Sequence, residues 1–493
     1  MSDGAAGERA RHETANRALK NTTVRAGADL VGKLCTFLLF AALGRAVGES
    51  GFGTFMFAFA LLEVLLVPVA LGADSYMLRR VAVEPEEIHR LFFNILVLKL
   101  VLAAPVIAGG IAVVALLGQG TLTLTTIAVL APGLLLEALA KTYHAAFNAA
   151  ERGELLAAGL IAQRVATAAA GVAVLLAGGG VVSVAAVYSA GAALQVGVGT
   201  LLMHRRIGLP RLAVSRGHWR RLALQTWPFA VQDAFTVLLF RVDAVLLSLI
   251  ATDAAVGRYG AAYRLLDSTL FVSWALGGAF AAMYAYLEED GEPSVGAVFQ
   301  RSVKLALVAL VPVAVVLGGL AKPVLEVIYG HEFGEGATAL ALLSPVVVLL
   351  AAVTLSSVLV TSRRDPASII PLSAGMVGLN VALNFALIPH YAEDGAAAAM
   401  LITELVFVGV ALRMAARAVG GLDWSAMLVA PLGAGTLMLA VVLALSGSLV
   451  PAVLAGLAVY APVLLVIERL VAPADLRFAA LLLRRRLAPT REA

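Results

Sequence analysis

The feature that most constrains this chain is a succession of apolar stretches, most of them about 20 residues long or longer, separated by short polar segments. In the hydrocarbon core of a bilayer every backbone N–H and C=O must be bonded within the protein, which a helix of this length achieves. We therefore predict an all-α polytopic membrane protein with fourteen spanning helices. They are expected at 26–47, 54–73, 91–117, 123–148, 155–177, 181–203, 226–250, 259–287, 303–321, 337–361, 368–389, 396–418, 427–447 and 449–471.

The composition supports this prediction. Of the 493 residues, 61% are hydrophobic and 14% are charged, whereas a soluble domain is about half apolar and about a quarter charged. The net charge is only +4, and most basic residues lie between the apolar stretches, so nothing favours binding to nucleic acid. Cys35 is the only cysteine, which excludes a disulfide within the chain. The sequence has no nucleotide-binding loop, zinc motif or serine-hydrolase elbow, so we expect no cofactor and no catalytic metal.

The distribution of basic residues predicts the orientation, because cytoplasmic loops carry an excess of Lys and Arg. If the first helix begins inside, the cytoplasmic segments hold most of the Lys and Arg residues, and the outside loops hold only Arg45, Arg258 and Lys322. An even number of helices then places both termini in the cytoplasm. Residues 1–21 are polar and lack the apolar core of a signal peptide, so we expect a disordered cytoplasmic tail there.

Two stretches repeat each other without a gap. Their common pattern is Gly-x-aromatic-x-x-Ala-aromatic-x-Leu-Leu-acid, and the second copy lies 204 residues after the first. Gly53, Phe55, Ala58, Phe59, Leu61, Leu62 and Glu63 recur as Gly257, Tyr259, Ala262, Tyr263, Leu265, Leu266 and Asp267. One difference stands out, since Ala60 of the first copy corresponds to Arg264 of the second.

The repeat divides the chain into related halves, and internal repeats around a site at the membrane midplane are typical of secondary transporters. We expect an N-terminal six-helix bundle at 22–207, a basic cytoplasmic linker at 208–225 and a C-terminal six-helix bundle at 226–420. Helices 13 and 14, at 427–471, fall outside the repeat, and 472–493 form a basic cytoplasmic tail.

Ionisable side chains within the predicted helices are candidates for a functional site, because a charge in hydrocarbon is costly. The candidates for contact with a substrate are Lys33, Lys99, Lys141, Arg164, Arg241, Arg264, Tyr259 and Tyr263. The carboxylates that would couple transport to an ion are Glu63, Asp243, Asp267 and Glu404. Arginine binds phosphate with fork-shaped donors, and aromatic rings offer flat faces to sugars, so Arg264 beside two tyrosines suits a sugar-phosphate ligand.

Helical spacing predicts which of these charges share a face, since residues three or four apart are neighbours. Three combinations are expected: Glu137 with Lys141, Asp233 with Arg241, and Arg264 with Asp267. Each of them has two interpretations. In the first, the two residues lie on a water-accessible helix face that contacts a ligand. In the second, they form a buried ion pair that only fixes helix packing.

One stretch has a more specific pattern. Residues 380–389 read Asn-Val-Ala-Leu-Asn-Phe-Ala-Leu-Ile-Pro, and Gly395 with four alanines follows. This closely resembles the signature of bacterial polysaccharide flippases of the O-antigen type, in the multidrug/oligosaccharidyl-lipid/polysaccharide (MOP) exporter superfamily. Ala392 stands where that signature usually has Gly. A more diffuse similarity extends over residues 20–420.

The resemblance implies two six-helix bundles around a central cavity. It also implies alternating-access transport of a polyprenyl-pyrophosphate-linked oligosaccharide from the cytoplasmic to the outer leaflet of the inner membrane, for cell-surface polysaccharide assembly. Polysaccharide polymerases and glycosyltransferases are the usual partners. Relatives line the cavity with basic residues on the first, second and eighth helices. Here Lys33 and Arg264 lie on matching helices, whereas the second helix has only Glu63. Helices 13 and 14 would accompany the lipid tail.

Two other functions stay open. An ion-coupled multidrug or cation antiporter of the same superfamily would use the intramembrane carboxylates for coupling, although the basic candidates disfavour a cationic drug. A membrane glycan polymerase, ligase or glycosyltransferase is less consistent with the short outside loops and the internal repeat. We therefore expect a transporter rather than an enzyme.

Overall fold

The computed structural model describes residues 2–208, 216–289, 295–363 and 370–473, and every regular element among them is a helix. These residues form two compact units. Unit 1 comprises Met1–Gly260 and Ile370–Ala392, and unit 2 comprises Ala261–Ile369 and Glu393–Ala493. The all-α polytopic class predicted from the apolar stretches is confirmed.

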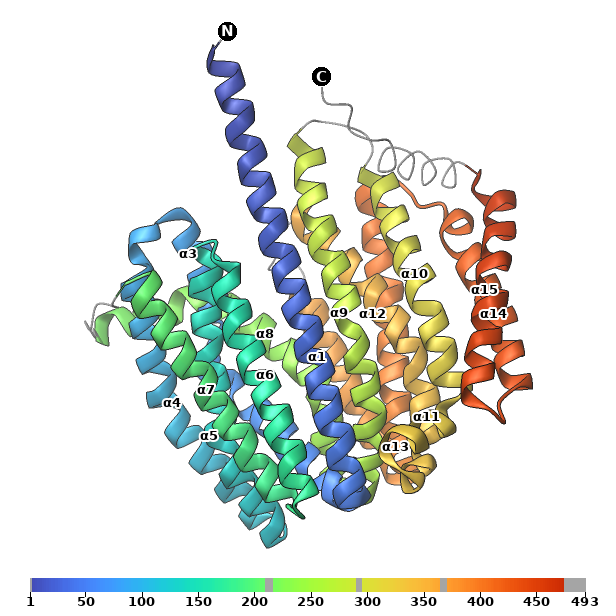
Figure 1. Cartoon of the computed structure of the whole chain (residues 1–493), viewed down its shortest axis with the longest axis horizontal. Helices are drawn as coiled ribbons and strands as arrows, with labels where there is room; N and C mark the ends of the chain where they lie inside the picture. Colours follow the sequence, from blue (N-terminus) through green and yellow to red (C-terminus); the bar gives the residue numbers. More distant parts are fainter. Residues whose placement is uncertain (1, 209–215, 290–294, 364–369, 474–493) are drawn as a thin grey trace. The chain divides into compact units, whose positions relative to one another are not determined.

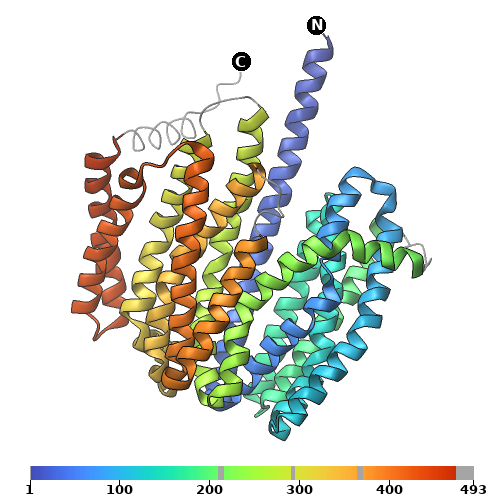
Figure 2. The ribbon, with the colours of Figure 1, turned by 180° about the vertical axis from the view of Figure 1, so that it is seen from behind.

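Unit 1 is built mainly from the first half of the chain. Its complete elements are α1 (Ser2–Leu65), α2 (Val67–Ala70), α3 (Ala73–Val83), η1 (Pro85–Glu87), α4 (Ile88–Leu116), α5 (Thr121–Ala149), α6 (Gly153–Leu176), α7 (Val181–Arg206) and α8 (Arg216–Ile250). Helices α4 to α7 run side by side in both front and back views (Figures 1 and 2), with α7 packed on α5 and on α6. The start of α9 and the first part of α13 complete the unit.

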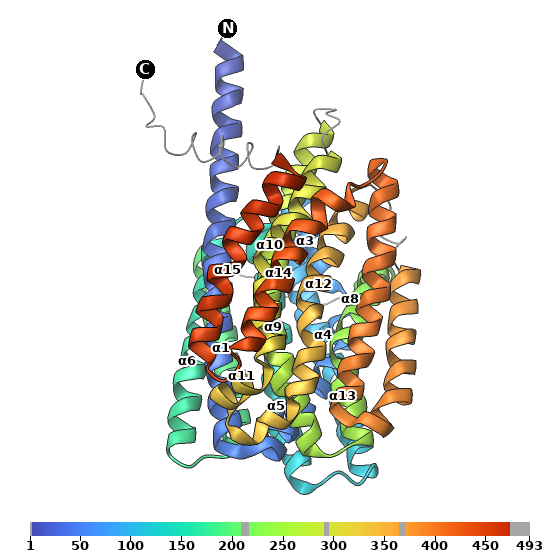
Figure 3. The same cartoon turned by 90° about the vertical axis from the view of Figure 1, so that its right-hand side faces the viewer.

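Unit 2 contains the remaining helices. They are most of α9 (Asp253–Glu289), α10 (Val295–Gly319), α11 (Ala321–Tyr329), η2 (His331–Gly336), α12 (Ala337–Arg363), the second part of α13 (Ile370–Val419), α14 (Trp424–Ala444) and α15 (Leu449–Val471). Helices α14 and α15 lie against each other, and α14 packs along α10 (Figure 3). The two helices expected outside the repeat are therefore anchored on the first helix of the 295–363 segment.

Ten helices in the described part of the chain are long and apolar enough to cross a membrane. Two of these ten contain a kink, at Gly48 (φ 69°) in α1 and at Ala392 (φ 46°) in α13, so each consists of two successive helices. Helices α8 and α9 coincide with two further predicted spans. Each of the fourteen predicted stretches thus falls on a helix.

Three expectations about the connecting segments need correction or lie outside the described residues. Helix α1 begins at Ser2, so the expected disorder of residues 1–21 was wrong: Ala, Arg, Lys and Glu favour helix there, and the adjoining helix removes the cost of nucleation. The expected linker 208–225 is partly helical, because α8 begins at Arg216. Most of the basic tail at 472–493 lies outside the described residues.

The second predicted span is broken rather than continuous. Leu71 (φ 50°) and Gly72 (φ 61°) adopt left-handed backbone between α2 and α3. A Cβ on Gly72 would lie only 2.4 Å from the backbone nitrogen of Ala230 in α8, so this position needs glycine for both its backbone and its space. The break places Asp74 in the first turn of α3, where the helix dipole favours a carboxylate.

The two copies of the repeat meet within unit 1 in a symmetric helix crossing. A Cβ on Gly53 would lie 1.8 Å from the carbonyl oxygen of Asp253, and a Cβ on Gly257 would lie 2.0 Å from that of Glu49. The two contacts are the same contact displaced by the 204-residue repeat. Arg258 Nη1 adds an ion pair of 2.9 Å to Glu49 Oε2. The structure therefore gives the repeated glycines a common role, which is to let two backbones touch.

Candidate functional site

Polar side chains of unit 1 interact with one another across several otherwise apolar helices, as expected for ionisable groups that avoid lipid. We call this group the polar seam. Its members are Glu63 of α1, Asp74 of α3, Lys99 of α4, Glu137 and Lys141 of α5, Arg164 of α6, Tyr188 of α7, and Asp233 and Arg241 of α8. It brings together four of the predicted substrate contacts and one predicted coupling carboxylate.

The centre of the polar seam is a three-helix contact around Glu137. Arg164 Nη2 donates to Glu137 Oε1 at 2.8 Å, and the hydroxyl of Tyr188 donates to the other carboxylate oxygen. The side chains of Arg164 and Glu137 remain 20% and 19% exposed. The pair is therefore accessible to a ligand from one side while α5, α6 and α7 hold it from the other.

Lys99 is the centre of a second cluster, in which Lys99 itself is buried and its partner Asp74 is 22% exposed. Its Nζ lies 2.6 Å from Asp74 Oδ2, 2.9 Å from the carbonyl of Ala138 and 2.9 Å from Thr142 Oγ1. The Thr142 hydroxyl donates to Asp74 Oδ1 at 2.8 Å. Lys99 is 1% exposed and its three donors are engaged, so it does not present a surface to a substrate in this structure. Its contacts join α3, α4 and α5.

Arg241 and Lys141 are the two further basic members of the polar seam. Arg241 pairs with Glu63 through its Nε, and the two side chains are 16% and 27% exposed. Lys141 is exposed and forms no ion pair with any described residue, although Glu137, Lys99 and Asp233 are close enough to interact with it electrostatically. The seam thus contains one cation that is directly available to an anionic ligand.

The charges of the polar seam balance. Lys99, Lys141, Arg164 and Arg241 stand against Glu63, Asp74, Glu137 and Asp233. The seam is therefore neutral overall rather than basic. Neutrality has a physical reason, because removing one partner of a buried pair leaves an uncompensated charge and costs about 3–5 kcal/mol.

Asp243 lies apart from the seam in a buried group of neutral donors. Tyr259 OH donates to its Oδ2 at 2.9 Å, and Asn384 Nδ2 donates to its Oδ1 at 2.7 Å. Asn384 also bonds Asn380 at 3.0 Å. Asp243 and Tyr259 are each 1% exposed. No Lys or Arg pairs with this carboxylate among the described residues, so its charge is held by hydrogen bonds alone.

The two asparagines of this group were not predicted as site residues. Both Asn380 and Asn384 stand in the motif at 380–389, and their spacing of four puts them on one helix face. That spacing was the signal in the sequence that could have singled out the two asparagines. The spacing alone does not indicate a site, because their partner Asp243 lies on a different helix.

Unit 2 holds the third arginine that was predicted to contact a substrate, Arg264. Arg264 Nη1 lies 3.3 Å from Asp267 Oδ2, which confirms the predicted pairing within one helix. Arg264 and Tyr263 are buried, at 8% and 4% exposure, and Tyr329 of α11 lies within electrostatic reach of the guanidinium. Glu404 is fully buried on α13.

The structure also contains an ion pair that the sequence did not predict. Lys304 of α10 pairs with Glu468 of α15, and both side chains are 9% exposed. Tyr460 of α15 donates to the carbonyl of Val308 at 3.1 Å nearby. This cluster fastens α15 to α10.

The other predicted pairs take different partners. Glu137 pairs with Arg164 rather than with Lys141, and Arg241 pairs with Glu63 rather than with Asp233. Lys33 lies half-buried on α1, outside the contacts described above. Within the described residues, no three His, Cys, Asp or Glu side chains come together to hold a metal ion.

Comparison with solved structures shows the fold. The lipid II flippase MurJ, in an inward closed conformation, matches with a TM-score of 0.71 over 91% of this chain and 99% of that chain, at 13% identity. An inward-facing multidrug resistance MATE family transporter of the MOP superfamily matches with a TM-score of 0.61 over 81% and 98%, at 15% identity. The MATE multidrug transporter DinF-BH gives 0.61 over 82% and 95%, at 18% identity.

Comparison of sequences shows the family. No curated protein matches the chain. Residues 18–274, more than half of the sequence, match the family model described as polysaccharide biosynthesis protein. This match ends at residue 274, before the motif at 380–399, so the family assignment and the motif support the predicted resemblance independently. The chain belongs to the polysaccharide biosynthesis protein family and has the fold of the MOP exporter superfamily.

Proposed function

We propose that the protein is a flippase that moves a polyprenyl-pyrophosphate-linked oligosaccharide from the cytoplasmic to the outer leaflet of the cytoplasmic membrane by alternating access. The observation that carries this proposal is the polar seam of unit 1, with Lys141 exposed and without an ion pair among the described residues. The family membership and the fold shared with a lipid II flippase support it. Both termini are then cytoplasmic, as the basic residues predict.

The substrate class follows from electrostatics. A pyrophosphate headgroup loses its hydration on leaving water, and a buried anion must be compensated by cations or hydrogen-bond donors. Lys141 offers a compact positive charge at once. Arg164 and Arg241 offer fork-shaped donors that match phosphate oxygens, provided that Glu137 and Glu63 give them up.

This exchange gives the carboxylates a role. In the absence of substrate they keep the arginines paired, so the seam is neutral and stable. When a pyrophosphate enters, it replaces a carboxylate as the partner of each arginine, and the freed Glu63 or Glu137 must be solvated or protonated. Substrate binding is thereby linked to the charge state of the seam. We propose Arg264 with Tyr263 as a further contact in unit 2.

Asp243 is our candidate for ion coupling. It is buried, and its described partners Tyr259 and Asn384 are neutral. A carboxylate in such a setting changes its interactions strongly when it binds a proton or a monovalent cation. Loss of transport on collapse of an ion gradient, with glycolipid binding retained, would support coupling. Transport that is indifferent to the gradient would remove it.

A second candidate function is ion-coupled multidrug or cation antiport. The balanced charge of the polar seam favours it, because Glu63, Glu137 and Asp233 could accept an organic cation. The fold match with the multidrug transporter DinF-BH is consistent with this alternative. Association with a polysaccharide polymerase and with glycosyltransferases belongs to the flippase proposal alone.

The deciding experiment is translocation of a polyprenyl-pyrophosphate-linked glycan in proteoliposomes. We expect transport by the wild type and a loss of roughly tenfold or more in Lys141→Gln, about 1.4 kcal/mol or more in substrate interaction. Lys322→Gln is the matched control, since Lys322 is an exposed lysine outside the seam. Equal transport by both variants would reject Lys141 as a contact. Gradient-driven efflux of a cationic dye without any glycolipid transport would establish the antiporter.

A further inference from the structure

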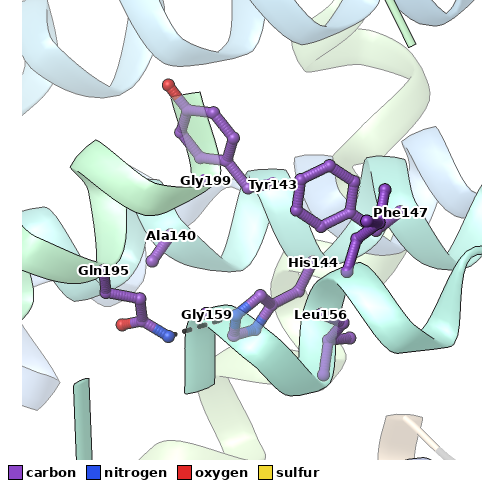
Figure 4. A pocket seen from close by; sticks show the side chains of 9 residues that line it. Ala140, Tyr143, His144, Phe147, Leu156, Gly159, Gln195 and Gly199 are labelled. Atoms are coloured by element: carbon purple, nitrogen blue, oxygen red, sulfur yellow. Dashed lines mark hydrogen bonds between the residues drawn. The ribbon is translucent and has the colours of Figure 1, made fainter. Parts of the chain in front are cut away.

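A small pocket lies inside unit 1 between α5, α6 and α7 (Figure 4). The side chains of Tyr143, His144 and Phe147 reach it from α5, and Gln195 reaches it from α7. Gly159 of α6 borders it, and a Cβ there would have nothing within 4 Å. The pocket is therefore space that the glycine leaves open.

The register of α6 and α7 extends this pocket into a polar layer. The two helices form an antiparallel pair, and a Cβ on Gly191 of α7 would lie 1.8 Å from Thr167 Oγ1 of α6. The turn between these helices lies at residues 177–180. Four residues further from it on each helix, Gln163 of α6 lies level with Gln195 of α7. After four more residues, Gly159 of α6 lies level with Gly199 of α7. Thr167, Gln163 and Gly159 thus share one face of α6, opposite the face of α7 that lines the pocket.

This layer contains hydrogen-bonding atoms without a protein partner among the described residues. Gln163 is 0% exposed, and neither its amide oxygen nor its amide nitrogen is bonded. The same holds for Thr167 Oγ1 and for the amide oxygen of Gln195, on side chains that are each 4% exposed. The Gln195 amide nitrogen lies 3.1 Å from His144 Nε2.

Such a concentration of unsatisfied polar atoms needs a physical account. Buried polar groups are bonded in the great majority of cases, to protein or to ordered water. A dry, unbonded amide would cost roughly 1–3 kcal/mol for each group. An internal water molecule typically makes about three hydrogen bonds to groups of this kind, and the unbonded atoms of Gln163, Thr167 and Gln195 lie on the packed helices α6 and α7 beside the pocket.

We propose that the α5–α6–α7 interior is a hydration site, in which ordered water molecules bond Gln163, Thr167 and Gln195 and extend into the pocket beside His144. Within this site His144 lies two helical turns from Glu137 on α5, Gln195 lies two turns from Tyr188 on α7, and Gln163 directly precedes Arg164 on α6. Water therefore reaches the three helices that carry the centre of the polar seam from within unit 1. This inference does not depend on what the protein transports.

The direct test is X-ray hydroxyl-radical labelling of the full chain in nanodiscs, because radicals formed from bound water modify the side chains that touch it. We expect Tyr143 and Phe147, which are 7% and 2% exposed, to be labelled several-fold faster than Phe55. Phe55 is the matched control, since it is 0% exposed in the aromatic cluster of α1 with Phe40 and Phe59. Labelling of Phe147 at the rate of Phe55 would overturn the proposal.

Two variants separate hydration from other causes. In Gly159→Leu the added side chain fills the pocket, so labelling of Phe147 should fall to the rate of Phe55 while that of a surface tyrosine such as Tyr391 stays unchanged. Gln163→Met keeps the volume and removes the amide, and it should lower the Tm because the water loses partners. A higher Tm in Gln163→Met would mean that the amide was dry and unbonded, which would also overturn the proposal.

Discussion

The two copies of the internal repeat have the same backbone crossing and different chemistry. Gly53 and Gly257 each touch a carbonyl on the other copy, at Asp253 and Glu49. Beyond this point the copies diverge. In the first, Glu63 pairs across helices with Arg241, and in the second the equivalent Asp267 pairs with Arg264 on its own helix. The repeat therefore specifies a helix contact, whereas the charges near the middle of each helix are free to specialise.

The paths of the two helices diverge as well. Helix α1 ends at Leu65 and is followed by α2 and by the left-handed residues Leu71 and Gly72, whereas α9 continues to Glu289. The break in the first copy sets Asp74 against Lys99. In the second copy an unbroken helix keeps its cation and its carboxylate one turn apart. The break in the helix is therefore the means by which the first copy contributes to a polar seam built from several helices.

The largest expected effect comes from the feature that both copies share. We predict that Gly53→Ala and Gly257→Ala each reduce stability by about 3 kcal/mol or more, because a methyl group would overlap a backbone carbonyl that cannot move aside. The measurement is thermal unfolding of the purified protein. Gly378→Ala is the control, since a Cβ there has nothing within 4 Å. If only one of the two repeat variants is affected, the crossing is not symmetric.

The next effect sharpens the difference between the ion pairs. We predict a coupling energy of about 1–3 kcal/mol between Glu63 and Arg241, because the pair is largely withdrawn from water and joins two helices. For Arg264 and Asp267, which are also largely buried, we predict a smaller coupling of less than about 1 kcal/mol, because their 3.3 Å contact lies within one helix and does not join two helices. Double-mutant cycles with Gln and Asn replacements, read by thermal unfolding, measure both. Equal couplings would contradict the comparison.

How far the sequence predicts this molecule depends on whether an interaction is local. The spanning helices follow from hydropathy alone, and the pairing of Arg264 with Asp267 follows from helical spacing. The pairs that cross helices do not follow, because hydropathy does not say which faces meet. Glu137 selects Arg164, and Arg241 selects Glu63, only once α1, α5, α6 and α8 are packed.

The same limit applies to the deviations of the backbone. Ala392 was noted as a replacement for glycine in the motif, and the structure shows why glycine is usual there: its φ of 46° lies in the left-handed region that favours glycine. The broken second span was not predicted, since Pro68 and Gly72 are ordinary in membrane helices. The close approach of Gly72 to Ala230 becomes visible only in three dimensions.

A third prediction concerns the one position at which the copies differ most in charge. We expect Arg264→Ala to lower glycolipid transport roughly tenfold, about 1.4 kcal/mol, while the protein still inserts. Its unfolding temperature should also fall, because the largely buried Asp267 loses its partner, so transport is compared per amount of folded protein. Arg264→Lys keeps the positive charge but loses the planar, bidentate donors of the guanidinium, so it should retain only part of the transport activity. Transport by Arg264→Ala at the wild-type rate would mean that the second copy uses its arginine only to neutralise Asp267.

The smallest expected effect concerns the N-terminal cap of α14, which lies outside both copies of the repeat and serves as a reference for changes made in them. Asp423 caps α14 by accepting a bond from Ala426 N at 3.0 Å and from Ser425 Oγ at 2.6 Å. The backbone N–H of Ala426, followed by the Ser425 hydroxyl, lowers the pKa of Asp423 below its ordinary 3.8. Because this pKa is depressed in the folded state, the contribution of the cap is fully present above the ordinary pKa. It is lost as the pH falls through the folded value.

Hydrogen exchange at Ala426 and Met427, corrected for the intrinsic effect of pH, measures the strength of this cap. We expect exchange to accelerate only below about pH 4, the ordinary range of an Asp side chain. Asp423→Asn is the control, because an asparagine also caps a helix but does not titrate, so its exchange should show no such step. The cap needs neither copy of the repeat, since its acceptor and donors lie within four residues. Its response should therefore be unchanged in Glu63→Gln, and a changed response would show that α14 is coupled to the polar seam.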